Sequence, residues 1–325
     1  MDRLPTEMLV NITRDLTAED LRQLRAANKR LKEIASPAAF SVVKVTNTFR
    51  SVQGLLQLLN SKAISGTIEV IEFVEDRDLG LASAALHPLP SLQFLNIQNL
   101  LAFSSPSWTH MSPLLERLHS LNIYVLTDDS ECSFYAEGLT EFYDVFSEII
   151  LPACRSLRNL SLNSTCMVGI MPPLDFRRVN HPYLTTLSLS SVAFAWNEED
   201  SPFGGAEDFI VRHAATLKSL ELIGCGLVIT EMAREPMQYW ASIWARFTET
   251  LTSLTFLRVK FDEREEPAQD GARKEIRYFS EDTEYGLLRH QEDLEGEEDD
   301  VPALEAFKAI VDSRRESEQK QSSLV

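Results

Sequence analysis

The chain has 325 residues, of which 44% are hydrophobic and 25% are charged, and its formal net charge is -18. This composition is typical of a globular protein with one large domain or two or three smaller ones. The negative charge disfavours nonspecific binding to nucleic acid and to anionic membranes, because both are themselves polyanionic. We therefore expect neither kind of partner.

The chain start and the cysteines indicate a reducing compartment. The first ten residues, MDRLPTEMLV, lack the apolar core of a secretory signal peptide. No uninterrupted apolar stretch approaches the roughly 20 residues needed to cross a bilayer. The four cysteines form no CxxC pair and have no zinc-like Cys/His spacing. We expect a cytoplasmic or nuclear protein.

Charge divides the chain into zones. Residues 1–45 contain six acids and eight bases, whereas residues 262–300 contain sixteen acids and five bases. Residues 301–325 contain four of each. We therefore expect an N-terminal domain over 1–45, a second domain over 46–261, an acidic segment over 262–300, and a C-terminal helix and tail over 301–325.

The first zone has the pattern of three short helices. Pro5 suits the first position of a helix, where its missing N–H is no loss. Thr17 is a predicted N-cap with Asp20 in the capping-box position, and Ser36 and Pro37 repeat the cap-then-proline signal for a third helix. Apolar residues recur at helical spacing at Leu4, Met8, Ile12, Leu16, Leu21, Leu24 and Leu31. So short a module buries little apolar surface alone, so it needs a partner or a following domain.

These residues resemble an F-box, whose pattern opens with Leu-Pro and an acidic residue and reaches a basic segment before a last hydrophobic helix. The matching positions are Leu4, Pro5, Glu7, Met8, Ile12, Leu16, Leu21, Leu24, Lys29, Arg30 and Ile34. Leu31 departs from the pattern, since many family members have Trp there. The alternative is an ordinary helical domain, in which Leu-Pro at a helix start is common.

The resemblance implies that this module binds a Skp-type adaptor and, through it, a cullin and a RING subunit. The implied adaptor-binding residues are Leu4, Pro5, Glu7, Met8, Ile12, Leu16, Leu21, Leu24 and Leu31.

A leucine-rich motif, LxxLxL, repeats through the second zone. It starts at Leu92, Leu118, Leu157, Leu184, Leu217 and Leu254, with a weaker version from Ile68. The starts lie 24 to 39 residues apart, so the repeats are irregular. A strand with alternate aliphatic residues buries one face, and a helix that returns to the next parallel strand covers it. The sequence predicts an α/β fold, an irregular leucine-rich-repeat-like solenoid with a parallel sheet and outer helices.

Three gaps between motifs have helical periodicity, at 139–153, 206–216 and 237–251. The repeat LKSLELIGCGL places Cys225 at a turn position of a leucine-rich repeat, so we expect a buried thiol rather than a nucleophile.

Strand alternation also predicts which side chains point away from the buried face. They occupy positions three, five and seven of each motif and are mostly hydroxyls and amides, with a net charge of +1. They are Phe94, Asn96, Gln98, Ser120, Asn122, Tyr124, Asn159, Ser161, Asn163, Thr186, Ser188, Ser190, Ser219, Glu221, Ile223, Phe256, Arg258 and Lys260. Such a composition is typical of protein recognition, although merely solvated strand residues explain it equally well.

From this face we select ten candidate target-binding residues. They are Phe94, Asn96, Asn122, Tyr124, Asn159, Ser161, Ser188, Glu221, Phe256 and Arg258.

The third zone is acidic, with one possible strand or hairpin and one helix. The segment KEIRYFSEDTEYG holds Ile276, Tyr278 and Phe279 and could form the strand or hairpin. Asp300 is a plausible cap before a helix over 301–316, with Leu304, Phe307, Ile310 and Val311 on one face. No calcium-loop pattern occurs among the carboxylates. Taken together, RYFSEDTEYG, DLEGEEDD and ALEAFKAIV are similar to the C-terminal part of many fungal F-box proteins with leucine-rich-like repeats.

No catalytic motif is present. The six histidines form no HExxH or HxH pair, and the chain has no GxSxG, P-loop or GxGxxG sequence. We therefore expect a non-catalytic protein without a metal or cofactor. The leading hypothesis is a substrate-recognition subunit of an SCF-type E3 ubiquitin ligase that binds an unknown target protein. The alternatives are an F-box scaffold or assembly protein outside the ligase, and a hydrolase whose site the motifs do not reveal.

Overall fold

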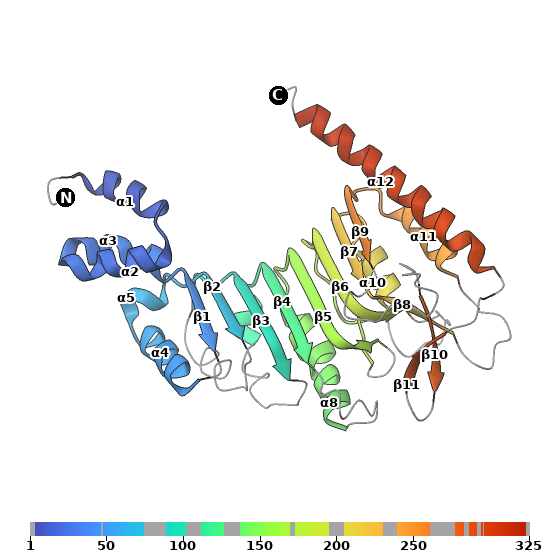
Figure 1. Cartoon of the computed structure of the whole chain (residues 1–325), viewed down its shortest axis with the longest axis horizontal. Helices are drawn as coiled ribbons and strands as arrows, with labels where there is room; N and C mark the ends of the chain where they lie inside the picture. The colour runs from blue at the N-terminus through green and yellow to red at the C-terminus, as the bar shows by residue number, and fades with distance from the viewer. Residues whose placement is uncertain are drawn as a thin grey trace, which may run out of the picture.

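The strands of this chain form one sheet, and helices pack on it and at its ends (Figure 1). The computed structural model describes residues 4–46, 48–74, 89–101, 112–126, 137–169, 173–194, 205–229, 239–260, 277–282, 286–290, 294 and 296–322. The strands are β1 (Val42–Thr46), β2 (Val70–Val74), β3 (Phe94–Leu101), β4 (Ser120–Leu126), β5 (Asn159–Val168), β6 (Thr186–Phe194), β7 (Ser219–Ile223), β8 (Gly226–Ile229), β9 (Phe256–Lys260), β10 (Tyr278–Asp282) and β11 (Gly286–Arg289).

The sheet runs in chain order from β1 through β7 and ends at β9. The strand β6 pairs with both β7 and β8, and β10 and β11 continue the branch that β8 begins. Every pairing in the described part is parallel except that of β10 with β11. The expected α/β fold with a parallel sheet and helices is therefore confirmed. The predicted strand or hairpin segment contains β10, and β11, its antiparallel partner, begins at the last residue of that segment and continues beyond it.

The helices are α1 (Thr6–Arg14), α2 (Ala18–Ala27), α3 (Lys29–Ala39), α4 (Phe49–Leu59), α5 (Lys62–Ser65), α7 (Ser112–Leu115), α8 (Glu137–Val145), the π-helix η3 (Phe146–Ile150), α9 (Leu151–Ala153), α10 (Ala206–Arg212), α11 (Trp240–Thr250), the 3-10 helix η4 (Glu297–Asp299) and α12 (Asp300–Ser322). Helices α1 to α3 lie at one end of the sheet, and α11 and α12 lie at the other (Figure 1).

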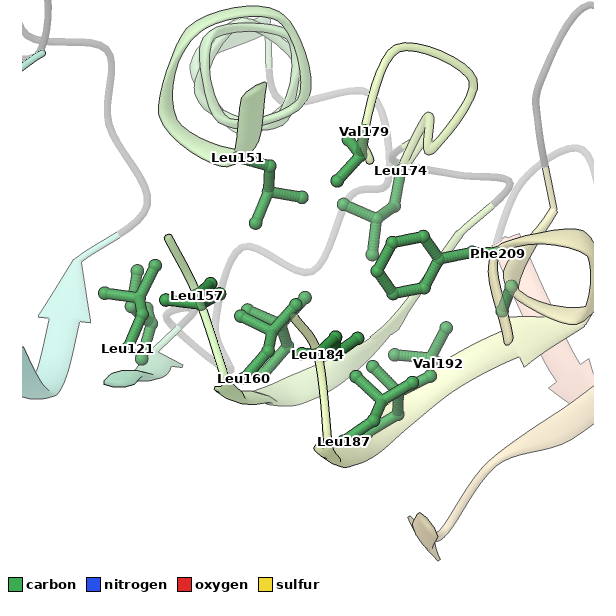
Figure 2. Packing of buried hydrophobic residues seen from close by; sticks show 14 of the residues in the cluster. Leu121, Leu151, Leu157, Leu160, Leu174, Val179, Leu184, Leu187, Val192 and Phe209 are labelled. Atoms are coloured by element: carbon green, nitrogen blue, oxygen red, sulfur yellow. The ribbon is translucent and has the colours of Figure 1, made fainter. Parts of the chain in front are cut away.

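The core forms because each strand turns its aliphatic residues to the same face. Leu95, Leu121 and Leu160 of β3, β4 and β5 are in register, and the row continues through β6 and β7. The first leucine of each full motif, just before its strand, is buried as well. Figure 2 shows the leucines of the sheet beneath Leu151 and Phe209, which come from the covering helices. The alternation therefore predicts the buried face correctly.

Of the two helix starts predicted in the N-terminal module, one is confirmed and one is wrong. The capping box is confirmed, because the Thr17 hydroxyl accepts the Asp20 N–H at 3.2 Å and the Asp20 carboxylate accepts the Thr17 N–H at 3.3 Å. The expected helix start at Ser36 and Pro37 is wrong. The third helix begins at Lys29, because the Asn28 side chain accepts the Leu31 N–H at 2.8 Å, and Pro37 lies inside its last turn.

The other predicted helices are present with changed ends. The helix expected over 139–153 is α8, η3 and α9 in succession, and the π-helical turn precedes Pro152, which has no N–H for a regular helical bond. The helix α10 ends at Arg212 rather than at residue 216, and α12 continues to Ser322 because Glu, Gln, Lys and Arg are good helix formers. The connection 173–185 between β5 and β6 contains no helix, so outer helices do not follow every strand.

The C-terminal helix is fixed to α11 by aromatic packing and by one buried carboxylate. Trp244 of α11 stacks on Trp240 and on Phe307 of α12, with ring centroids 4.9 and 6.2 Å apart. Asp300 accepts the Ala241 N–H at 2.6 Å and the Tyr278 hydroxyl at 2.5 Å. Asp300 thus caps α11 from the first residue of α12, and it joins both helices to β10.

Two buried histidines join α10 to the connection between β5 and β6. The His213 ring lies with Nδ1 2.7 Å from the Phe209 carbonyl oxygen, and its Nε2 accepts the His181 backbone N–H at 2.9 Å. Nδ1 must then carry the single proton of a neutral ring. Burial, reinforced by the neighbouring His213, lowers the pKa of His181 to about 4, and burial also lowers the pKa of His213.

These pKa values predict acid sensitivity of the fold. Because the folded state binds protons less readily than the unfolded chain, stability should fall as the pH drops below about 6.5, the ordinary histidine pKa. From His181 alone, the free energy of unfolding should decrease by about 2 kcal/mol between pH 7 and pH 5. Urea denaturation at both pH values measures this loss. His181→Gln should reduce the difference, with His119→Gln at a half-exposed position as the control, and an unchanged pH dependence in His181→Gln would contradict the assignment.

Candidate protein-interaction surfaces

The outward side of the sheet places polar side chains in continuous rows. One row runs across eight strands in register. It consists of Lys44, Glu72, Asn96, Asn122, Ser161, Ser188, Glu221 and Arg258. Six of the ten candidate target-binding residues lie in it. Strand alternation and parallel pairing therefore align on one face residues up to about 200 positions apart in the sequence.

Hydrogen bonds connect neighbours across these strands. The Asn122 amide donates to Asn96 Oδ1 at 3.0 Å, and the Asn163 amide donates to Asn122 Oδ1 at 3.4 Å. At the other end, Glu221 accepts the Ser188 hydroxyl at 3.0 Å and the Arg258 guanidinium at 2.5 Å. This preorders the polar side chains, so binding a partner costs less side-chain entropy.

Two aromatic residues stand on the same face. Phe94 and Phe256 are 40% and 41% exposed, and both lie in the row that includes Asn159. Five strand spacings separate them, or about 24 Å at the usual distance between strands. Each exposed ring is a possible apolar anchor beside hydrogen-bonding groups, which is the composition of a protein-recognition surface. We call this outward side, with its two phenylalanines, the sheet face.

The prediction for position seven fails in β6. Ser190 is buried rather than exposed, although it stays in register with Asn163 and Ile223. The next residue, Ser191, has a positive φ of 58°, and beyond it the strand pairs with β8. A second irregularity occurs in β3, where Asn99 has a φ of 57° and the register with β4 shifts after Ile97. Gln98 and Tyr124, the position-seven residues of β3 and β4, are therefore not opposite each other. Between these two strands, only positions three and five keep the regular register of the sheet face.

The predicted adaptor-binding residues divide into exposed and buried groups. Met8 and Ile12 of α1 are 51% and 40% exposed, whereas Leu21 and Leu31 are buried within the helical module. Leu16, Leu24 and Leu4 are partly buried, and Pro5 and Glu7 are exposed. The spacing of four residues thus marks the outer side of α1. The residues that pack inward are Leu9 and Thr13.

An apolar groove lies between α1 and the helices α2 and α3, with the exposed Ile12 in its lining. It has a volume of about 350 Å³ and is lined by Leu9, Ile12, Thr13, Leu16, Asp20, Gln23, Leu24 and Leu31. Val10, which is also exposed, was not among the predicted residues, although it belongs to the run Met8-Leu9-Val10. A run of three apolar residues in a helix cannot be buried on one side, so this run was an available signal for a surface patch.

Two thiols in the described part, those of Cys154 and Cys225, are unsuited to nucleophilic chemistry. Burial raises the pKa of Cys154 and of Cys225 to about 12 in each case. Cys225 donates to the Leu189 carbonyl at 3.4 Å, which confirms that it is a buried turn residue. Cys132 lies outside the described residues. Across the ranges that the structure describes, His, Cys, Asp and Glu side chains form no cluster of three that could hold a metal ion.

No protein-family model matches the chain, and no curated protein shows significant similarity to it. In the same described ranges, no helix combines the length and apolar character needed to span a membrane.

The orientation of the sheet face predicts a sharp contrast between adjacent residues. Phe94→Ala should lower the free energy of unfolding by less than about 1 kcal/mol, because an exposed ring loses little burial. Leu95→Ala, one position along β3, should cost about 2 to 5 kcal/mol, because it leaves a cavity in the core. Chemical denaturation of both variants provides the comparison. Equal losses would mean that the ring of Phe94 is part of the core.

Proposed function

We propose that this chain is the substrate-recognition subunit of an SCF-type E3 ubiquitin ligase. The observation that carries the proposal is the N-terminal module, in which F-box-like residues form three helices and leave Met8 and Ile12 exposed beside an apolar groove. Large apolar side chains in such a position are typical of a protein-protein contact. Residues 1–45 would bind a Skp-type adaptor, and the adaptor would connect the chain to a cullin and a RING subunit.

The contact would use the outer side of α1 and the groove. Met8 and Ile12 would enter the partner, and Leu16 and Leu24 would line the groove from within. Full burial of a large aliphatic side chain contributes about 1.5 to 3 kcal/mol. Met8 and Ile12 are half exposed, so each would supply part of that amount against the entropy lost on association. The buried Leu31 would form part of the groove wall. The buried Leu21, which does not line the groove, would support the surface by packing beneath it.

The sheet face would bind the target protein. Its support is the preordered row of amides and hydroxyls between two exposed phenylalanines. The chain would contribute no chemical group to ubiquitin transfer. It would hold the target near the ubiquitin-charged enzyme, and proximity would raise the rate of transfer. The leucine-rich-repeat-like solenoid belongs to this proposal, because adjacent parallel strands in chain order provide the long face that a target requires.

Adaptor binding can be tested on the outer side of α1. Met8→Asp with Ile12→Asp should weaken co-purification of a Skp-type adaptor at least about tenfold, because two charges would enter an apolar contact. Both positions are exposed, so the unfolding midpoint should stay close to that of the wild type. Val301→Asp is a matched control, because Val301 is an exposed apolar residue on α12. A wild-type chain that retains no adaptor, or equal retention by the double variant, would contradict the proposal.

Target binding can be tested with the same double variant. Under proteasome inhibition, Met8→Asp with Ile12→Asp should still retain the target but lose the adaptor and the cullin. Adding Phe94→Asp and Phe256→Asp should remove the target as well, whereas Tyr183→Asp, at an exposed residue of the β5 to β6 connection, should not. Mass spectrometry of the retained proteins measures both effects. Retention of the adaptor without any cullin would favour a scaffold outside the ligase.

A further inference from the structure

A second groove lies where the N-terminal helices meet the first strand of the sheet. It has a volume of about 820 Å³, and its lining comes from α2, β1, α4, the segments between them, and Ile64 of α5. The apolar part of the lining includes Phe40 and Leu58. A Cβ atom placed on Gly54 of α4, which also lines the groove, would meet no atom within 4 Å, so the space above this helix is open.

The charge of this groove is opposite to that of the chain. Arg22, Arg25, Lys44 and Arg50 line it, and none of its described lining residues is acidic. Lys44 and Arg50 form no ion pair with any residue that the structure describes. Arg22 makes one ion-pair contact with the described residues, a long one of 3.5 Å to the exposed Glu19. Four basic groups therefore converge on one groove in a chain of net charge -18.

One of these groups is held in place over an aromatic ring. The Arg25 guanidinium carbon lies 4.3 Å from the centre of the Phe40 ring, and Arg25 Nε donates to the Ser36 hydroxyl at 2.8 Å. Both contacts restrict the side chain before any ligand binds. A preordered guanidinium beside an apolar surface suits a ligand that combines carboxylates with apolar side chains.

The groove also follows the unpaired edge of β1. Three consecutive residues of β1, Val42, Val43 and Lys44, line it. Side chains of consecutive strand residues point to opposite faces, so a groove that touches all three runs along the strand edge. Among the strands that the structure describes, β1 pairs with β2 alone, on its other side.

Backbone groups at this edge are available to a further strand. The Thr46 N–H donates to the Ser51 hydroxyl at 2.9 Å, away from β2. Because successive backbone groups point to alternate edges, the N–H and C=O groups of Val42 and Lys44 face the same side as that N–H. No group in the described part of the chain bonds to them there. An unpaired strand edge is a template for the addition of an extended peptide.

We propose that the groove binds an extended acidic peptide of a partner protein, which adds to the sheet as a strand beside β1. Main-chain hydrogen bonds would come from Val42 and Lys44, and the peptide carboxylates would meet the four basic side chains. Lysine on a sheet edge commonly prevents pairing, but here the charges exclude neutral and basic strands and admit acidic ones. Pairing of two copies edge to edge through β1 is disfavoured, because two such basic grooves would repel each other, and nucleic acid is disfavoured by the net charge. This inference holds whether or not the N-terminal helices bind an adaptor.

The test uses the full chain and a fluorescein-labelled peptide of alternating glutamate and valine, followed by fluorescence anisotropy. Binding is expected at low salt and should weaken as salt rises. A peptide of alternating lysine and valine should not bind. Lys44→Glu with Arg50→Glu should lower the affinity at least about tenfold, whereas the control Lys62→Glu, at an exposed lysine of α5 that does not line the groove, should change it less than about twofold. Equal effects of the double variant and the control would overturn the proposal.

Strand addition is tested on the peptide, so that no variant needs to fold. N-methylation of every second peptide residue removes the N–H groups on one edge only, and two such peptides cover the two edges. One should lose at least about tenfold in affinity and the other should bind nearly as well as the unmodified peptide. Equal affinities of the two methylated peptides would overturn strand addition, as would full displacement of the peptide by inorganic phosphate or preferential binding of duplex DNA. Failure of adaptor binding, measured separately on Met8 and Ile12, would leave this result unaffected.

Discussion

The structure depends on the parallel register that joins the leucine motifs across the sheet. Because side chains alternate between the two faces of a strand, a slip of one residue in any strand would move its leucines from the core to solvent. The register of Leu95, Leu121 and Leu160 therefore determines, on the opposite face, the row that includes Asn96, Asn122 and Ser161. The same register therefore orders both the core and the polar face, so the polar face needs no packing of its own to be well ordered.

Much of the sheet could be predicted because its signal is local and repeats. Each LxxLxL motif contains the alternation of a strand, and the intervening apolar periodicity indicates α8, α10 and α11. The sequence did not reveal the branch at β6, because a bend at Ser191 and the pairing with β8 depend on contacts distant in the chain. The start of the third helix was also missed, since both Asn28 and the Ser36-Pro37 pair are acceptable start signals, and the side-chain bond from Asn28 decides between them.

The candidate surfaces differ in how far the sequence could locate them. The sheet face follows from alternation alone. In α1, apolar residues occur on more than one side of the helix, so periodicity could not tell the packed residue Leu9 from the exposed Met8. The basic groove could not be predicted, because Arg22, Lys44 and Arg50 belong to three elements that only tertiary packing brings together. In the composition, only the slight excess of basic residues in 1–45 indicated the basic groove.

The even spacing of the polar row limits the shape of anything that lies across it. Neighbouring strands are about 4.8 Å apart, whereas an extended peptide repeats its side chains on one side every 6.7 Å or so, and a helix repeats a turn about every 5.4 Å. Neither repeat distance stays aligned with the strand spacing over more than a few strands. A ligand that crosses all eight strands therefore cannot engage Asn96, Ser161 and Glu221 through one regular segment. In the proposed function, such a face would favour folded targets that contact it through several segments over short linear motifs.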